Sequence, residues 1–189
     1  HATVRGPLAD KNKIEAHLTI PTLKAQYQQL EIGAAQPMRV DYANSVVVLQ
    51  PAVLKGTDSS LQFQGRLPLR GAERMNVSAK GSIDMKLAQM FNPDLQTGGK
   101  ILLDISAGGT VKSPGMHGDV RFQGVTFASQ TMPVGIDNFN ADMQVTDTGV
   151  QITNAVGHMG GGEIQLGGSV IYRPALQANV SVTAKSVRL

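Results

Sequence analysis

Residues 160–184 alternate between apolar and polar side chains, and this alternation restricts the fold more than any other feature of the sequence. Apolar side chains fall on one parity from Ile164 to Tyr172, and the alternation resumes from Leu176 to Ala184. Arg173-Pro174 stands between the two segments and is expected to form the turn. Because successive side chains of a β-strand point to opposite faces, the pattern predicts a hairpin with one apolar and one polar face.

The same hairpin occurs earlier in the chain. Residues 41–80 align without a gap with residues 144–183, at an offset of 103, and ten of these positions are identical. Unrelated segments of ordinary composition would share roughly two or three. The chain is therefore expected to consist of two repeats that form one continuous sheet. Residues 1–100 would be the first repeat, ending in a short helix, and residues 101–189 a second repeat that is truncated at its C-terminal end.

Other alternating segments bring the expected total to about a dozen strands, antiparallel because the links between them are short. The clearest alternation is in Phe139–Val145, and a second lies in Ile101–Ala107. The apolar parity changes across Gly124, as a β-bulge requires. Only residues 84–91 have helical spacing, and they predict one short α-helix with Ser82 or Asp84 as its cap.

The apolar face of such a sheet needs a cover that one short helix cannot provide. A dozen strands would span roughly 55–60 Å at ~4.8 Å per strand. The sheet could fold face to face as a sandwich, close as a barrel, or curl into an open trough. Aromatic residues are only 4% of the chain, there is no Trp, and there are 21 Gly, which favours the trough. An ordinary β-sandwich core is the alternative. An open trough would need an apolar ligand, because soluble monomers rarely expose so large an apolar patch.

No group of residues in the sequence is arranged for catalysis or for binding a metal or a cofactor. The four histidines, His1, His17, His117 and His158, lack metal-ligand spacing, and there is no cysteine. Gly160–Gly162 lacks the lysine and the helix of a phosphate-binding loop, and a tight turn explains it. The net charge of +3 comes from scattered residues and does not suit a nucleic-acid interface. We therefore expect no enzyme, no cofactor, no metal and no nucleic-acid partner.

An ordered series of strands punctuated by Gly and Pro resembles a known family. The segments are, in order, Ile101–Asp104, Gly109–Pro114, Gly118–Phe122, Met132-Pro133, Ile136–Phe139, Gly161–Glu163 and Leu166–Gly168. They are similar to the C-terminal repeat region of the TamB family (translocation and assembly module), within the wider AsmA-like group. The similarity covers the second repeat well and the first repeat more loosely, through Gly81–Asp84 and Asn92-Pro93.

The resemblance implies a β-taco, which is one elongated antiparallel sheet curled into a U-shaped apolar trough. It also implies a periplasmic segment of an inner-membrane-anchored protein of a Gram-negative bacterium. The family is linked to phospholipid movement between the inner and outer membranes, and to outer-membrane protein assembly with an Omp85-type (TamA-like) barrel. The anchor and the part that meets the barrel would lie outside this chain, in which no apolar run is long enough to cross a bilayer.

Two functions are consistent with the apolar stripe and the resemblance. The chain could be a segment of a conduit that binds phospholipid acyl chains without chemistry. It could instead be a chaperone or scaffold for outer-membrane β-barrel proteins such as autotransporters, acting by β-augmentation. An adhesin or structural repeat with a closed core is a third interpretation. The residues expected to line the trough are Leu61, Phe63, Leu67, Ile101, Leu103, Ile105, Val120, Phe122, Phe139, Met143, Val145, Ile164, Leu166, Leu176, Val180 and Val182.

Overall fold

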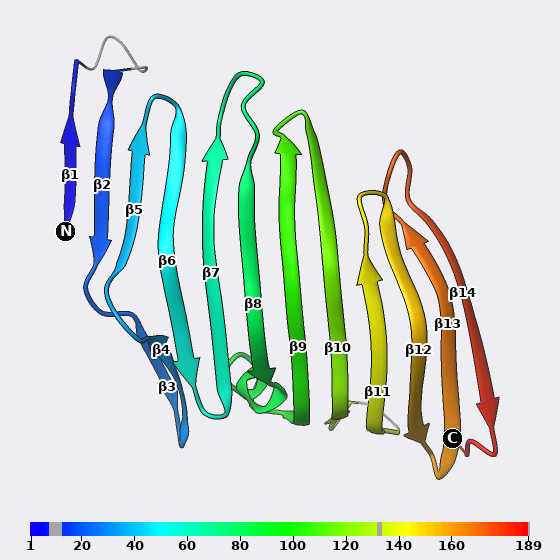
Figure 1. Ribbon diagram of the computed structural model, residues 1–189. Helices are drawn as coiled ribbons and strands as arrows, with labels where there is room; N and C mark the ends of the chain where they lie inside the picture. Colours follow the sequence, from blue (N-terminus) through cyan, green and yellow to red (C-terminus); the bar gives the residue numbers. More distant parts are fainter. Residues whose placement is uncertain (8–12, 132–133, 189) are drawn as a thin grey trace.

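The computed structural model describes residues 1–7, 13–131 and 134–188, and nearly all of them belong to one β-sheet (Figure 1). Met132-Pro133, which contributes to the family resemblance, lies outside the described residues. The strands are β1 (Ala2–Arg5), β2 (Glu15–Ile20), β3 (Lys24–Tyr27), β4 (Leu30–Ala34), β5 (Met38–Ala43), β6 (Val46–Gly56), β7 (Ser59–Pro68), β8 (Asn76–Asp84), β9 (Leu95–Thr110), β10 (Ser113–Ser129), β11 (Ile136–Val145), β12 (Gly149–Met159), β13 (Gly162–Ile171) and β14 (Gln177–Lys185).

The strands lie in the sheet almost in chain order. The path across it is β1-β2-β5-β6-β7-β8-β9-β10-β11-β12-β13-β14, while β3 and β4 form a hairpin beside this path and β4 also pairs with β6. Every described pairing is antiparallel. The expectation of a mostly β protein built on one long antiparallel sheet is therefore confirmed.

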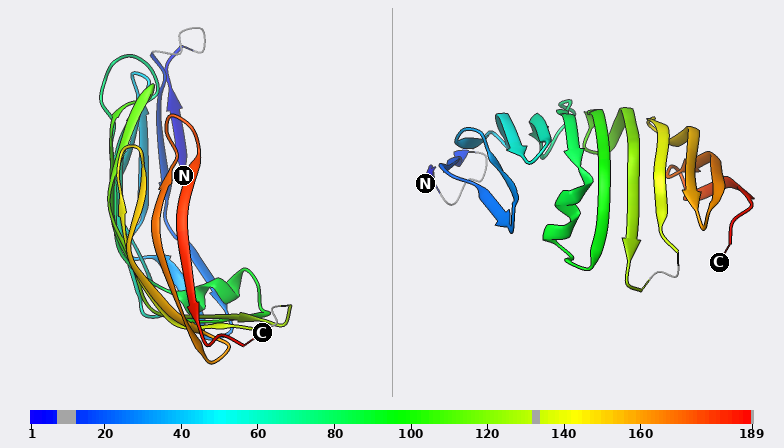
Figure 2. Two further views of the ribbon diagram at one scale, coloured as in Figure 1. Left: turned by 90° about the vertical axis from the view of Figure 1, so that its right-hand side faces the viewer. Right: turned by 90° about the horizontal axis from the view of Figure 1, so that it is seen from below.

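The sheet is open, so the expected U-shaped trough is wrong for this structure. β1 pairs only with β2 and β14 only with β13, and no described strand joins the two edges. The strands bow along their length, but the molecule stays a single layer (Figure 2). We expected the curl because the apolar face needs shielding. Strand pairing, however, determines only the neighbours of each strand and the twist between them, not how closely distant strands approach.

Two central strands are longer than the alternation of side chains indicated. β9 has 16 residues and β10 has 17, whereas the sequence pattern marked only Ile101–Ala107 within β9. The extra length of β9 contains Gly98-Gly99 and Gly108-Gly109. Glycine has no side chain to place on either face, so periodicity cannot detect a strand where glycines stand in the pattern.

The β-bulge expected at Gly124 is present. The register between β10 and β11 shifts between Phe122 and Val125, and Gly124 has a φ of +54°. This left-handed conformation is readily adopted by glycine because it has no Cβ. The extra residue keeps the apolar side chains of β10 on one face, although their parity in the sequence changes.

The two halves of the chain pair their strands in the same register. β6 and β7 have counterparts in β12 and β13, each displaced by 103 residues. The register shift between Leu49 and Ala52 in the first pair recurs between Ile152 and Ala155 in the second. The 103-residue offset between similar segments of the sequence is therefore also the offset between strand pairs of identical register. The division into units at residue 100 stays a prediction.

The helix near residues 84–91 is a 3-10 helix, η2 (Met85–Met90), and not the expected α-helix. Asp84 caps it as expected, because its carboxylate accepts a hydrogen bond from the N–H of Lys86 at 2.8 Å. Near its end the N–H of Phe91 donates to the carbonyl of Ala88 at 3.1 Å, which is the i→i+3 pattern. Segments this short commonly adopt the tighter 3-10 turn, which spacing in the sequence does not distinguish from an α-turn.

Replacing Asp84 with alanine is expected to lower the free energy of unfolding by about 1 kcal/mol, because the cap of η2 is lost. The Asp84 side chain is buried, but its own N–H is bonded to Ser59 Oγ at 2.8 Å and keeps that bond in the variant. Urea denaturation followed by circular dichroism measures the loss. Asp84→Asn keeps an accepting oxygen and should lose less than half as much. Equal losses in the two variants would contradict the capping role.

Candidate functional site: the apolar face of the sheet

Strand register arranges apolar side chains into rows that cross the sheet. Leu103 in β9, for example, pairs with Gly81 of β8 on one side and with Val120 of β10 on the other. Cross-strand partners point to the same face, so such a row is continuous. From β6 to β14, this row contains Leu54, Leu61, Gly81, Leu103, Val120, Met143, Ile152, Gly168 and Val180.

The structure places fifteen of the sixteen residues selected from the sequence on this apolar face. The exception is Leu176, which precedes β14 and is 78% exposed in the turn. That these residues bind a ligand stays a prediction. The fifteen are Leu61, Phe63 and Leu67 of β7, Ile101, Leu103 and Ile105 of β9, Val120 and Phe122 of β10, Phe139, Met143 and Val145 of β11, Ile164 and Leu166 of β13, and Val180 and Val182 of β14.

Sequence reasoning missed other residues of the same face. Ile83 pairs with Ile101, Val150 with Val145, and Ile152 with Met143, so each lies beside a residue that was selected. The apolar face also extends into β2, β5 and β6, where it includes Leu18, Val40, Leu49 and Leu54. For Leu18, Val40, Ile83 and Ile152 the signal was available in the sequence, because polar residues stand on both sides of each; Leu49 and Leu54 follow other apolar residues, so alternation does not mark them.

Residues 1–7, 13–131 and 134–188 form no second layer over this face. Among the described residues only eight hydrophobic side chains are buried, and three of them are alanines. The solvent-accessible surface is 11,950 Å² for 20.0 kDa, whereas a compact monomer of this mass exposes about 8,700 Å². The excess of more than a third is what an uncovered single layer produces. The sheet is thus held together by strand pairing and side-by-side contacts within one layer.

In the described part of the chain, one corner of the apolar face is partly covered, by η2 on the inner side of the bowed sheet (Figure 2). Leu87 of η2 is buried, and Thr97 Oγ1 of β9 donates a hydrogen bond to the carbonyl of Met85 at 2.8 Å. At the centre of the face the rings of Phe122 and Phe139 meet edge to face, with centroids 5.8 Å apart. These contacts leave most of the face open to solvent.

The apolar face offers surface but no chemically reactive group. The described residues contain no buried side-chain nitrogen or oxygen that lacks a hydrogen-bond partner. They also contain no group of three His, Cys, Asp or Glu side chains placed to hold a metal ion. A ligand on this face would be held by burial of apolar surface, which is non-directional.

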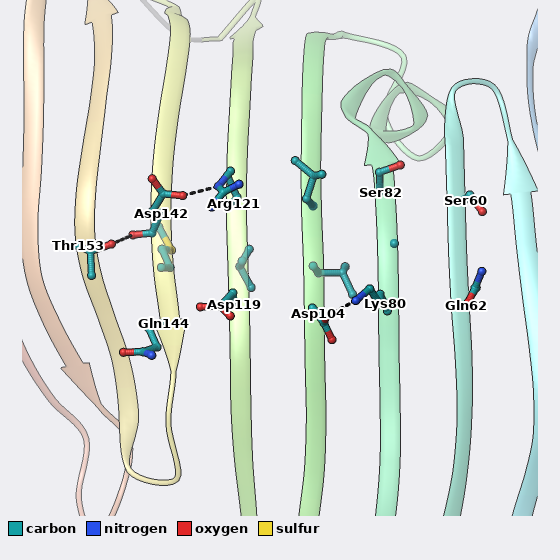
Figure 3. A pocket seen from close by; sticks show the side chains of 15 residues that line it. Ser60, Gln62, Lys80, Ser82, Asp104, Asp119, Arg121, Asp142, Gln144 and Thr153 are labelled. Carbon is teal, nitrogen blue, oxygen red and sulfur yellow. Dashed lines mark hydrogen bonds and ion pairs between the residues drawn. The ribbon is translucent and has the colours of Figure 1, made fainter.

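The opposite face is polar and has an open hollow of about 800 Å³ over β7 to β12 (Figure 3). Two cross-strand ion pairs lie in it, Lys80 Nζ to Asp104 Oδ2 at 2.6 Å and Arg121 Nε to Asp142 Oδ1 at 2.5 Å. The hydrogen bond that Lys80 donates to Asp104 raises the pKa of Lys80, and the one that Arg121 donates to Asp142 raises the pKa of Arg121. All four side chains are largely exposed, so each pair contributes little to stability.

This hollow does not resemble a catalytic centre. Asp104 and Asp142 each pair with a cation on a neighbouring strand, and Asp119 faces Asp104 directly across β9 and β10. Like charges at directly opposed positions repel each other, and Lys80 offsets the repulsion by bonding Asp104. The polar face therefore acts as the solvated side of the sheet, and the apolar face is the better candidate for a functional surface.

Comparison of this chain with known proteins gives no match. No family model matches the chain, and no curated protein or solved structure matches it significantly. Within the part of the chain that the structure describes, no helix combines the length and the hydropathy needed to cross a bilayer.

Proposed function

We propose that this chain is a segment of a periplasm-spanning conduit that binds phospholipid by its acyl chains and moves it between the inner and outer membranes. We propose further that it belongs to the TamB family or its wider AsmA-like group, which the order of its strands resembles. The observation that carries the proposal is the continuous apolar face of a one-layer sheet, which no element of the described chain covers apart from η2.

Burial of acyl chains would supply the affinity. Each methylene moved from water onto apolar surface contributes about 0.8 kcal/mol. Two acyl chains lying on the sheet would also remove from water much of the apolar surface that the rows of Leu, Val, Ile and Met expose. A bare face of this extent is unusual for a soluble monomer, so a resident apolar ligand accounts for it.

The same surface would let a bound lipid move. Among the described residues no buried side-chain nitrogen or oxygen is left without a hydrogen-bond partner that a lipid could use, so positions along a row are similar for a methylene chain. Non-directional binding of this kind would retain the lipid on the face without a single position at which its binding free energy is much more favourable than elsewhere. A conduit needs both properties, and it needs no catalysis, so we propose a binding role and no enzymatic one.

The setting of this function is proposed from the resemblance. The parent protein would be anchored in the inner membrane of a Gram-negative bacterium, and this segment would lie in the periplasm and support outer-membrane biogenesis. Contact with an Omp85-type (TamA-like) outer-membrane barrel would be made by parts of the parent protein outside this chain. The open sheet suits a broad lipid-binding surface rather than an enclosed trough.

A second function, as a chaperone or scaffold for outer-membrane β-barrel proteins, is favoured by the same face, since unfolded barrel strands are apolar on one side. The two functions differ in what contacts residues such as Leu103 and Met143 in cells. A photo-cross-linker at these positions in the parent protein should capture phospholipid if the chain is a conduit, and nascent polypeptide if it is a chaperone.

Native mass spectrometry and lipid extraction of the purified chain test the proposal directly. We expect phospholipid to copurify with a substantial fraction of the protein molecules when the chain is expressed in a Gram-negative host. Added phospholipid micelles should also load the lipid-free protein. A chain that carries no lipid after purification and takes up none from micelles would rule out the conduit.

A further inference from the structure

We propose that one end of the sheet, the upper rim, binds the phosphate of a phospholipid headgroup, while the acyl chains of the same lipid run from there onto the apolar face. The upper rim is the end at which β7 connects to β8, β9 to β10, β11 to β12 and β13 to β14, at the top of Figure 1. The lower rim is the opposite end, where η2 lies. This inference rests on the proposed function, because it assigns the headgroup of the lipid whose acyl chains the apolar face would bind.

The two rims differ in charge between β6 and β14. The described connections of the upper rim carry an excess of cations, whereas those of the lower rim carry a small excess of carboxylates. The charged residues of the upper connections are Arg70, Arg74, Lys112 and Arg173 with Glu73 and Asp147, and those of the lower connections are Lys86 with Asp58 and Asp94. Glu73 is already bonded to Arg66 of β7, at 2.8 Å. An anionic group is therefore attracted to the upper rim.

An arginine at the upper rim occurs in both halves of the chain. Arg70 follows β7 and Arg173 follows β13, at the offset of 103 residues that relates these two strands. Each arginine comes directly after a residue on the parity of the apolar face, Leu69 in the first half and Tyr172 in the second. Both halves thus place a guanidinium where a strand of the apolar face ends.

Arg173 is held in position at this rim by two contacts. Its Nη1 donates a hydrogen bond to the carbonyl of Pro114 in β10, and its guanidinium lies 5.7 Å from the centroid of the Tyr172 ring. The Tyr172 hydroxyl in turn donates to the carbonyl of Thr146. Pro114 comes two residues after Lys112, so the Arg173 guanidinium lies beside the β9–β10 turn. A guanidinium has five N–H donors, which leaves donors for the oxygens of a phosphate.

The other cations of the upper rim are open to an anionic ligand. Arg70, Arg74 and Lys112 are exposed, and none of them forms an ion pair with a residue that the structure describes. On the polar face, by contrast, Lys80 and Arg121 are each paired with an aspartate. A phosphate therefore finds uncompensated positive charge at the rim rather than on the polar face.

The apolar face is also more open toward the upper rim. η2 covers a corner of the face at the lower end of β8 and β9, where Leu87 is buried (Figure 1). At the upper end, Met116 of β10 pairs with Ala107 of β9 and stays 37% exposed. An acyl chain that starts at the upper rim can lie along the strands, whereas one that starts at the β8–β9 corner of the lower rim meets η2.

Calorimetric titration with soluble short-chain phosphatidylglycerol, and with the diacylglycerol that has the same acyl chains, tests the headgroup site. We expect phosphatidylglycerol to bind about fivefold more tightly or better, and salt should reduce this difference by screening the charges. Equal affinities would overturn the headgroup site but leave acyl-chain binding intact, and no binding of either lipid would overturn both. Glycerol phosphate that binds as tightly as phosphatidylglycerol would show a site for a free anion instead.

Two double variants locate the site. Arg70→Gln with Lys112→Gln removes two charges from the upper rim, and Lys55→Gln with Lys86→Gln removes two exposed charges at the lower rim. We expect the upper pair to weaken phosphatidylglycerol binding about fivefold and to leave diacylglycerol binding unchanged, while the lower pair changes neither. Equal losses in the two pairs would show that net charge and not the upper rim attracts the headgroup, and would overturn the inference.

Arg173→Gln tests the positioned guanidinium, with circular dichroism as the check on folding. We expect a similar loss of phosphatidylglycerol affinity and no change for diacylglycerol. Unchanged phosphatidylglycerol binding by both Arg173→Gln and the upper pair would refute the site.

Discussion

Replacing Val145 with aspartate is expected to abolish lipid retention, with a loss of at least tenfold in lipid bound per protein. Val145 is 6% exposed on the apolar face and pairs with Gly118 and Val150, so a carboxylate there lies among apolar neighbours and beside any bound acyl chain. Burial of an unpaired charge also lowers the free energy of unfolding by roughly 2–4 kcal/mol. Lipid extraction with mass spectrometry measures retention, and urea denaturation measures stability.

Two companion variants make this result interpretable. Gln151→Asp adds the same charge to the opposite, exposed face in β12, where it faces Gln144 and Ser169, and it should retain lipid normally. Phe139→Asp places the charge at a half-buried position of the apolar face, where the cost to folding is smaller. If Phe139→Asp stays folded by circular dichroism and still retains lipid like the original chain, the apolar face is not the lipid site.

Replacing Gly168 with alanine is expected to lower the free energy of unfolding by roughly 2–4 kcal/mol. Gly168 has a φ of +126°, a conformation that side chains rarely adopt, and an added Cβ would overlap the carbonyl oxygen of Asn179 in β14. Either the β13–β14 pairing or the local backbone must shift to make room. Urea denaturation gives the stability, and hydrogen exchange should show the loss of protection concentrated in β14.

Gly167→Ala is the matched control for this prediction. Gly167 precedes Gly168 in β13 and has no left-handed backbone, and the nearest atom to an added Cβ is Ser181 Oγ at 3.7 Å, an ordinary contact. This variant should be neutral or stabilising by a few tenths of a kcal/mol, since alanine restricts the unfolded chain more than glycine. Similar losses at the two positions would show that the backbone of Gly168 is not specially constrained.

Strand content and pairing were predictable wherever side chains alternate. Residues 160–184 predicted a hairpin that the structure has as β13 and β14, and the offset of 103 residues reappears in the register of β6 with β7 and of β12 with β13. The cap at Asp84 and the bulge at Gly124 were also readable, since each depends on a local residue type. These features result from interactions over a few residues or between adjacent strands.

The predictions failed for features that the alternation of apolar and polar side chains does not determine. The full lengths of β9 and β10 were missed because glycines give no parity, and the type of helix at Met85–Met90 was wrong because α- and 3-10 turns share the same short spacing. Leu176 continues the alternation of β14 but lies before the strand begins, since the turn after Tyr172 extends further than the pattern indicated.

The amino-acid sequence by itself determined that this protein is an antiparallel sheet with one apolar and one polar face. It also determined that the chain has too few large side chains to form a core that would cover the apolar face. That follows from period-two patterning and composition, which act locally along every strand. Only the tertiary structure decided that the sheet stays open. The sheet's overall curvature depends on the small twist at each of many strand pairs, and no single segment determines it.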